Sequence, residues 1–116
     1  MKGWIAQAQA ELVKAGIPMS KMNAAQLGAL IASESSNDPR AVNHWDSNAK
    51  AGHPSMGLMQ TIRPTFEQYK LPGHDDITNP VDNIIAGVRY AVDRYGSISN
   101  VPGVRQLAAG NAYVGY

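Results

Sequence analysis

The strongest structural signal in the sequence is the stretch "NPVDNIIAGVRYAVDRYG", residues 79–96, which carries the signals for both ends of a helix. Asn79 is a favoured N-cap residue, and Pro80 suits the first helical position because its missing N–H is not needed there. Gly96 is a typical C-terminal stop. The apolar side chains between them recur on one helical face: Ile84, Val88, Ala91, Val92 and Tyr95. The stretch predicts an amphipathic helix over residues 80–95.

The same kind of signal predicts four further helices, over residues 2–15, 24–35, 64–70 and 104–109. Asn23 is the expected cap of the second of them, which must end before Pro39. Residues 42–62 instead contain short apolar fragments separated by Asn, Asp, Ser, Gly and Pro, which is typical of an irregular loop or a small β-ribbon. We therefore expect a mainly α fold with one irregular insert.

The composition restricts the kind of protein that this chain can be. With 116 residues, of which 44% are hydrophobic, residues 1–116 are expected to form a single domain. The net charge is +1 and the basic residues are scattered, so the sequence lacks the basic stripe of a nucleic-acid-binding protein. Without cysteine there is no thiol nucleophile and no zinc-thiolate site. Because residues 1–10 resemble neither a signal peptide nor a membrane span, we expect export to depend on a longer parent chain or a virion.

Glu34 is unusual because it ends the apolar helical run of "IASESSNDPRAV", residues 31–42. It follows Leu30 by four residues and Ile31 by three, so it shares the helix face that enters the core. Apolar surroundings and the negative end of the helix dipole both raise the pKa of a carboxyl group there. An acid that keeps its proton near neutral pH is suited to protonate a glycosidic oxygen. The competing interpretation is that Glu34 caps or pairs at an exposed helix end.

The segment "PSMGLMQTI", residues 54–62, has the composition of a sugar-binding wall. Gly57 permits close backbone approach, and the Met59 thioether offers a pliable apolar surface. The amide of Gln60 suits hydroxyl and N-acetyl groups. The alternative is that the apolar residues of this segment belong to the core.

Three motifs in this order resemble those of the soluble-lytic-transglycosylase-type lysozyme-like domains: "ESSNDPRAV", "SMGLMQTIRPTF" and "NPVDNIIAGVRYAVDRYG". The resemblance covers residues 24–96 and continues more faintly beyond them. It implies a small, mostly helical lysozyme-like fold whose groove binds the glycan strands of peptidoglycan without a cofactor. The wording of "WDSNAKAGHPSMGLMQTI" and "YGSISNVPGV" is most similar to the domains within tail tape-measure proteins of phages that infect actinobacteria.

The resemblance also implies residue roles at the matching positions. Glu34 would be the sole catalytic acid and base: it would protonate the oxygen between N-acetylmuramic acid and N-acetylglucosamine and then accept the proton of the muramoyl C6 hydroxyl. The product would be a 1,6-anhydro end at the bacterial cell wall. The expected substrate-binding residues are Ser55, Gly57, Met59, Gln60 and Tyr90. We expect a monomer that has neither a nucleic-acid partner nor a membrane-inserted segment.

One late segment departs from the family pattern. The family commonly carries an Ala-Tyr-Asn-Ala-Gly motif, whereas "LAAGNAYVG" has Gly110 where the tyrosine would stand. Asn111 and Ala112 still fit, so Asn111 is expected at the groove. Either Tyr113 fills the tyrosine's place from a shifted backbone, or the site lacks this hydroxyl.

Two alternative functions remain open on the sequence. A second carboxylate that positions water would give lysozyme-type hydrolysis of the same bond. Asp46 and Asp38 are the candidates, although Asp38 precedes a proline in a turn where such side chains usually bind the local backbone. The other alternative is a non-catalytic peptidoglycan-binding module.

Other functional residues are less well supported by the sequence. Trp45 and Tyr69 are candidate sugar-stacking residues. The three histidines, His44, His53 and His74, lie in predicted loops without the spacing of metal ligands, so no metal site is expected. No serine lies in the G-x-S-x-G context of a nucleophilic hydrolase.

Overall fold

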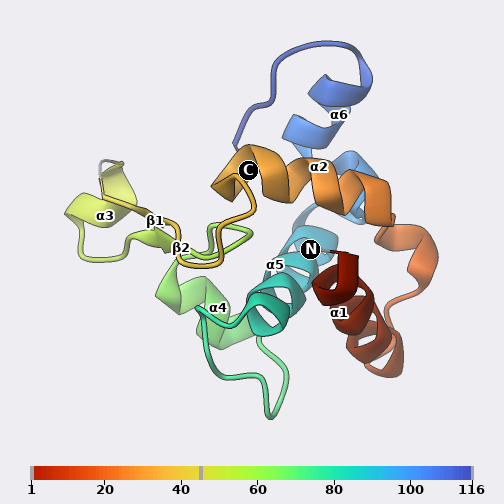
Figure 1. Ribbon diagram of the computed structural model, residues 1–116, viewed down its shortest axis with the longest axis horizontal. Coiled ribbons are helices and arrows are strands. Elements are labelled where there is room, and N and C mark those ends of the chain that lie inside the picture. The colour runs from red at the N-terminus through yellow and green to blue at the C-terminus, as the bar shows by residue number, and fades with distance from the viewer. Residues whose placement is uncertain (1, 45, 116) are drawn as a thin grey trace.

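Helices and one short β-ribbon make up the computed structural model, which describes residues 2–44 and 46–115 (Figure 1). The α-helices are α1 (Lys2–Lys14), α2 (Ala24–Ser35), α3 (Ser47–Lys50), α4 (Arg63–Tyr69), α5 (Pro80–Tyr95) and α6 (Pro102–Ala108). The strands are β1 (Val42–Asn43) and β2 (Ser55–Met56), and two 3₁₀ turns are η1 (Met19–Lys21) and η2 (Ile98–Asn100). The predicted mainly α fold is confirmed.

Helix α5 lies at the centre of the molecule, with α1 and α4 packed against it (Figure 1). Its residues 82–88 are all buried, which is expected of a helix that is covered on several sides. The Asn79 side chain accepts hydrogen bonds from the N–H groups of Val81 and Asp82 at 3.0 and 3.1 Å, and Gly96 ends the helix with a φ of 91°. The predicted span of residues 80–95 is therefore confirmed, with both of its end signals.

Helix α2, which carries Glu34, also has the predicted bounds. The Asn23 side chain caps it by accepting the N–H of Gln26 at 3.0 Å. Leu27, Leu30 and Ile31 turn into the core and are fully buried. This face fixes the direction in which the last turn of α2 presents its side chains.

The other helical boundaries shift by one or two residues from the predicted ones. Helix α1 ends at Lys14 rather than at residue 15, and α4 begins at Arg63 rather than at residue 64. Helix α6 begins at Pro102, two residues before the predicted start, because a proline is well placed in a first helical turn.

The main hydrophobic core joins α1, α2, α5, η2 and α6. Its buried residues come from α1 and α2, from the 58–59 turn, from α5, and from η2 and α6, so that it extends along the chain from Ile5 to Val104. A smaller cluster of Phe66, Ile77 and Ala86 lies between α4, the 71–79 loop and α5. The two clusters hold α2, α4 and α5 in fixed positions.

The β-ribbon forms in the predicted irregular insert. Strands β1 and β2 are antiparallel, with Val42 opposite Met56 and Asn43 opposite Ser55. The ribbon and α3 project from one side of the helical body (Figure 1). Helix α3 was not expected from the sequence, since it is a single turn that depends on one cap: the Asp46 side chain accepts the N–H of Ala49 at 2.9 Å.

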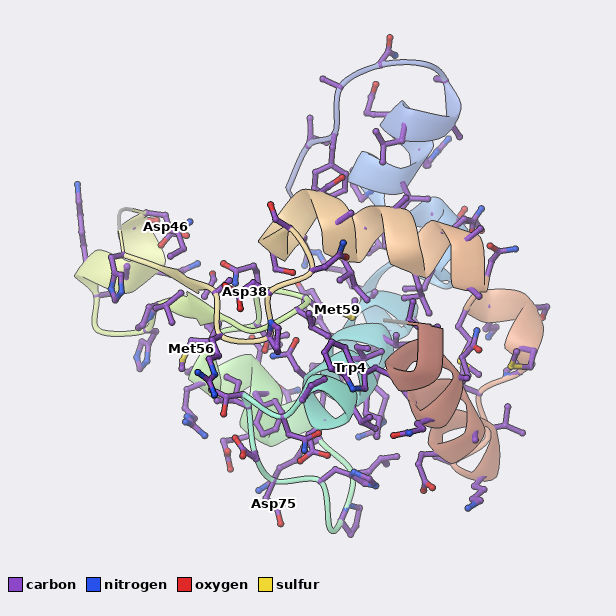
Figure 2. All side chains as sticks on the ribbon, in the orientation of Figure 1. Trp4, Asp38, Asp46, Met56, Met59 and Asp75 are labelled. Carbon is purple, nitrogen blue, oxygen red and sulfur yellow. The ribbon has the colours of Figure 1, made fainter. Side chains whose placement is uncertain are left out.

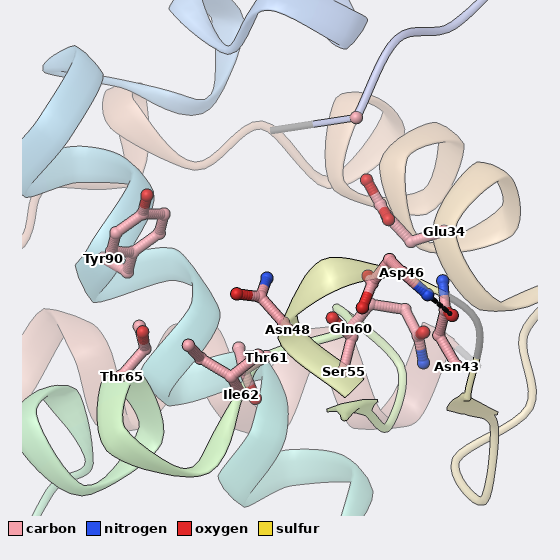
Figure 3. A pocket seen from close by; sticks show the side chains of 11 residues that line it. Glu34, Asn43, Asp46, Asn48, Ser55, Gln60, Thr61, Ile62, Thr65 and Tyr90 are labelled. Atoms are coloured by element: carbon pink, nitrogen blue, oxygen red, sulfur yellow. Dashed lines mark hydrogen bonds between the residues drawn. The ribbon is translucent and has the colours of Figure 1, made fainter. Parts of the chain in front are cut away.

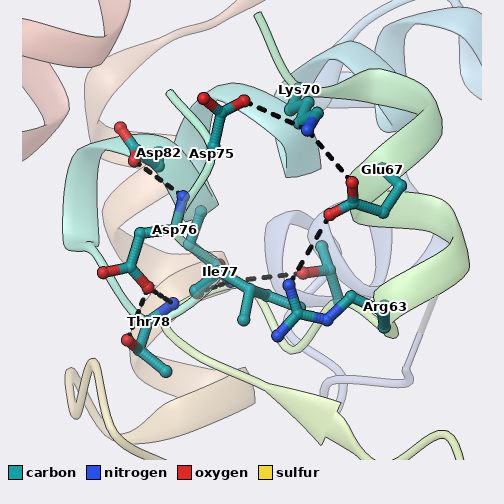
Figure 4. Close-up of polar contacts among 10 residues, drawn as sticks. Arg63, Glu67, Lys70, Asp75, Asp76, Ile77, Thr78 and Asp82 are labelled. Atoms are coloured by element: carbon teal, nitrogen blue, oxygen red, sulfur yellow. Dashed lines mark hydrogen bonds and ion pairs between the residues drawn. The ribbon is translucent and has the colours of Figure 1, made fainter. Parts of the chain in front are cut away.

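A chain of surface ion pairs fastens α4 to the loop that follows it (Figure 4). Lys70 lies 3.0 Å from Glu67 and 3.0 Å from Asp75, and Glu67 also lies 3.6 Å from Arg63. Exposed pairs of this kind typically contribute less than about 1 kcal/mol each. They orient the loop more than they stabilise the fold.

Within residues 2–44 and 46–115, none of the helices combines the length and the apolar character needed to cross a bilayer.

Candidate active site

Glu34 occupies the last turn of α2, and the backbone changes direction directly after it. Ser36 and Asn37 both have left-handed backbone, with φ values of 54° and 64°. Gln60 is the third such non-glycine residue among those described, with a φ of 53°. Non-glycine residues in this region are strained by about 1–3 kcal/mol each and tend to occur at functional sites. All three lie on the two segments that carry the candidate acid and the sugar-binding motif.

The carboxyl group of Glu34 is partly buried and accepts a hydrogen bond at Oε2 from the hydroxyl of Tyr113. Burial raises the pKa of Glu34 above its ordinary value, and the hydrogen bond from Tyr113 offsets part of that rise by stabilising the ionised form. Burial, followed by the adjacent Glu34, raises the pKa of Tyr113 well above that of a free phenol, so this hydroxyl remains a donor. The arrangement favours a carboxyl group that keeps its proton.

A groove of about 360 Å³ opens beside Glu34 (Figure 3). This volume lies in the range of about 300–1,000 Å³ that is typical of ligand pockets. The ribbon and α3 form one side, where the groove is lined by Asn43, Asp46, Asn48 and Ser55. The other lining residues come from the turn after β2, from α4 and α5, and from the end of the described chain: Gln60, Thr61, Ile62, Thr65, Tyr90 and Gly115. Most of these side chains are polar but uncharged, which suits a substrate rich in hydroxyl and amide groups.

The structure brings four of the predicted site residues together at this groove: Glu34, Ser55, Gln60 and Tyr90. Gln60 donates through Nε2 to the carbonyl oxygens of Ala41 and Gly57, at 3.1 and 2.9 Å. These bonds use the amide N–H groups and leave the amide oxygen as the group with which Gln60 can accept a hydrogen bond from a ligand.

Gly57 and Met59 lie behind the groove lining rather than in it. Met59 is fully buried in the main core, and Figure 2 shows it in the interior of the molecule. A Cβ atom on Gly57 would lie 2.3 Å from Nδ2 of Asn83, so only glycine fits there. The positions of Gly57 and Met59 favour a role in supporting the turn rather than the predicted direct contact with substrate.

Asn83 is a structural residue of the site that sequence reasoning missed. From the buried face of α5, its Oδ1 accepts the N–H of Met59 at 2.8 Å. Its Nδ2 donates to the carbonyl oxygens of Met56 and Ile77 at 3.0 and 2.9 Å, and contacts Oγ1 of Thr61 at 3.2 Å. Asn83 thereby fixes the 56–61 turn to the central helix. The sequence does contain a signal for this role: Asn83 is an amide among apolar residues of the 80–95 helix, and a buried amide needs hydrogen-bond partners.

The two aspartates considered as water-positioning bases differ in position (Figure 2). Asp38 is exposed, lies outside the groove lining, and accepts the N–H of Arg40 at 2.9 Å in a local turn. Asp46 does line the groove, but its carboxylate is engaged as the cap of α3. Of the two, only Asp46 is placed where a second acid could act.

The remaining predicted residues have varied positions. Tyr113 does bring a hydroxyl to Glu34, from a segment that passes the end of α2. Asn111 is exposed and outside the groove lining, and it donates to the Gln106 side chain at 2.9 Å at the end of α6. Tyr69 does not line the groove but packs edge-on against Tyr90, with ring centroids 5.6 Å apart. Trp45 lies outside the described residues.

Metal ligands are not gathered in the described part of the chain, where no three His, Asp or Glu side chains are positioned to hold an ion. His74, in the 71–79 loop, instead lies between α5 and α1. Its Nδ1 is 2.7 Å from Oδ1 of Asp82 in α5, and its Nε2 is 3.9 Å from Oε2 of Glu11 in α1. The lining of the groove itself offers carboxyl, hydroxyl and amide groups.

Comparison with known proteins shows the family to which the chain belongs. The family model described as "Transglycosylase SLT domain" matches residues 11–115. The chain is also similar to the uncharacterized protein YqbO of Bacillus subtilis (strain 168), with 59% identity over 83 residues. That match covers 72% of this chain but 5% of the relative, so the chain spans a small part of the relative's length. No solved structure matches the chain. With a matching model over most of its length and a lysozyme-like arrangement of helices, the chain belongs to the transglycosylase SLT domain family.

Proposed function

We propose that this domain is a lytic transglycosylase that cleaves the β-1,4 bond between N-acetylmuramic acid and N-acetylglucosamine in peptidoglycan. The family supports the substrate class. The observation that carries the proposal is a partly buried Glu34, with a raised pKa, at the side of a polar groove. A protonated carboxyl group is the acid that cleavage of a glycosidic bond requires.

In the proposed reaction Glu34 acts twice. It donates its proton to the glycosidic oxygen while the bond from that oxygen to the muramoyl C1 breaks. The C6 hydroxyl of the same muramoyl residue then bonds to C1, and its proton passes to the Glu34 carboxylate. The acid is restored, a 1,6-anhydro ring is formed, and no water is consumed. One carboxyl group is sufficient for this sequence of steps.

The neighbouring residues suit this chemistry in different ways. The hydrogen bond from Tyr113 stabilises the carboxylate that exists between the two proton transfers. Ser55 and Gln60 offer polar groups to the sugar hydroxyl and N-acetyl substituents along the same groove.

Hydrolysis by the same scaffold is the second candidate function, because Asp46 shares the groove with Glu34. A hydrolase would need that carboxylate to position water or to act as a nucleophile. Its role as the cap of α3 already accounts for its position, and capping by Asp is common. This is why we favour the reaction with one acid.

Mass spectrometry of the soluble products from purified peptidoglycan distinguishes the two reactions. A transglycosylase yields muropeptides that end in 1,6-anhydro-N-acetylmuramic acid. A hydrolase yields products that are heavier by one water. Products that are mainly of the heavier kind would replace the proposal with the hydrolase, and binding without release of soluble fragments would support a non-catalytic module.

The parent polypeptide is proposed to be a tail tape-measure protein of a phage. The support is the wording of the motifs around residues 45–62 and 95–104, together with the small share of YqbO that the chain matches. Peptide mass spectrometry of purified virions from the strain that carries the gene tests this. Peptides of the domain are expected in the particles, and their absence from particles that contain the other tail proteins would contradict it.

A further inference from the structure

The segment of residues 111–115, which contains neither helix nor strand, crosses from the end of α6 to the end of α2 (Figure 1). Its Tyr113 ring packs against the main core, and the hydroxyl of that ring reaches Glu34. Two residues further on, Gly115 lines the groove. The segment therefore places both a donor on the acid and part of the groove wall.

Gly103 of α6 provides the space in which this segment lies. It is buried, and a Cβ atom added to it would lie 2.2 Å from Cε1 of Tyr113 and 2.3 Å from the carbonyl oxygen of Val114. Real Cβ atoms do not approach so closely, so one of the two segments would have to move. By contrast, a Cβ atom on Gly28 of α2 would meet nothing within 4 Å.

The backbone conformation of Gly103 does not itself require a glycine. Its φ is not among the positive values of this chain, and it lies in the first turn of a regular helix. Alanine is a better helix former than glycine. Substitution by alanine should therefore preserve α6 and displace the 111–115 segment.

We propose that Gly103 is a positioning residue of the active site: the notch left by its missing side chain seats Tyr113, so that the Tyr113 hydroxyl bonds to Glu34 and Gly115 borders the groove. The catalytic meaning of this arrangement rests on the proposed function. The seating itself is a property of the fold and can be measured without activity.

The test is a double-mutant cycle read by the titration of Glu34. Tyr113→Phe keeps the ring and removes the hydroxyl, so it removes a bond that stabilises the carboxylate and should raise the titration midpoint. In the Gly103→Ala background the ring should already have moved away from Glu34, so adding Tyr113→Phe should leave the titration midpoint of Glu34 unchanged. In the matched Gly28→Ala background, Tyr113→Phe should raise this midpoint as much as it does in the wild-type domain.

Carbon-13 NMR of the glutamate side chains gives the midpoints directly. The chain has three glutamates, Glu11, Glu34 and Glu67, and the signal missing from Glu34→Gln identifies the one of interest. Among the described residues, the other ionisable groups at this contact are Asp46 and Tyr90 in the groove and Tyr95 beside Tyr113, and they are the same in every variant. An equal shift from Tyr113→Phe in all three backgrounds would overturn the proposal.

Measurements of activity and of folding test the proposal independently of the titration. Gly103→Ala should lower kcat/KM on peptidoglycan by about tenfold or more and alter its pH profile, because small displacements at an active site are costly. If Gly103→Ala does not fold, Gly103→Ala/Tyr113→Gly is compared with Tyr113→Gly alone, because the ring also packs against the core. The double variant should fold as well as Tyr113→Gly. If it fails where Tyr113→Gly folds, the ring is not what the space at Gly103 accommodates, and the proposal is overturned. A wild-type domain without activity would refute the proposed function and leave the titration cycle to test the seating.

Discussion

At the scale of single residues, the site is defined by an acid in surroundings that disfavour its charge. Burial raises the pKa of Glu34, and the Tyr113 hydroxyl moderates the rise. The surroundings that keep Glu34 protonated also mean that its ionised form destabilises the folded state. Activity and stability should therefore respond oppositely when the charge is removed.

Replacement of Glu34 by Gln should stabilise the domain at neutral pH but not at low pH. The pKa of Glu34 in the folded state lies above its ordinary value of 4.5, so its contribution to stability is fully present below that value. The contribution is lost as the pH rises through the folded-state pKa, whereas glutamine has no proton to lose. Urea unfolding of both proteins from about pH 4 to about pH 8 measures this. A difference between the two free energies of unfolding that does not grow with pH would contradict the raised pKa.

The role of Asp46 can be separated from that of Glu34 by an amide substitution. Asparagine caps helices about as well as aspartate, so Asp46→Asn should keep α3 and retain peptidoglycan cleavage within about threefold. If Asp46 were a general base, the rate would fall by a factor on the order of 10² or more. The measurement is the initial rate of release of soluble muropeptides.

At the scale of elements, the position of the sugar-binding turn depends on α5. Asn83 binds backbone groups of Met56, Met59 and Ile77, and the turn carries Gln60 into the groove. Gly57 is needed because Asn83 lies so close to it. The turn and the central helix therefore form one unit.

Replacement of Asn83 by Ala should destabilise the domain by about 3 kcal/mol or more. The substitution removes the side-chain partner of the Met59 N–H and of the Ile77 carbonyl oxygen and leaves a cavity, whereas the Met56 carbonyl oxygen keeps the N–H of Thr61. Each buried group that loses its partner costs about 1–3 kcal/mol. Asn100→Ala is the matched control, because Asn100 is exposed and donates to the carbonyl oxygen of Tyr95 at 3.1 Å. Chemical unfolding should show a loss below about 1.5 kcal/mol for the control. Equal losses in the two variants would show that Asn83 does not hold the turn.

The elements that sequence reasoning predicted well are those whose signals are local. Helix α5 has a cap, a proline and a terminal glycine within its own stretch, and α2 has Asn23 and an apolar stripe. Asn83 was missed because three of its four partners lie more than 20 residues away along the chain: Met59 at 24, Met56 at 27 and Thr61 at 22. The place of Tyr113 stayed open for the same reason, since its partner Glu34 is 79 residues away.

At the scale of the whole molecule, one core joins the elements that form the site. It includes residues of α1, α2, α5 and α6, and its members extend from Ile5 to Val104. Glu34, the turn and the 111–115 segment are all attached to this core. The side of the groove that these three parts form should therefore persist as long as the core does.

Residues 1–116 are expected to unfold in a single cooperative transition as a monomer. Proteins of this size have an unfolding enthalpy of about 0.7 kcal/mol per residue near 60 °C, which gives about 80 kcal/mol here. Calorimetry should find equal calorimetric and van't Hoff enthalpies, and light scattering should give the mass of one chain. Two separate transitions would mean that the ribbon and the helical body are not one unit.

The central claim is that a single acid performs the cleavage. The most direct measurement is the rate at which Glu34→Gln, folded like the wild-type domain, releases soluble fragments from purified peptidoglycan. A loss on the order of 10²-fold or more is expected, because the proton that the glycosidic oxygen needs can no longer be supplied. A Glu34→Gln protein that cleaves at the wild-type rate would contradict the account.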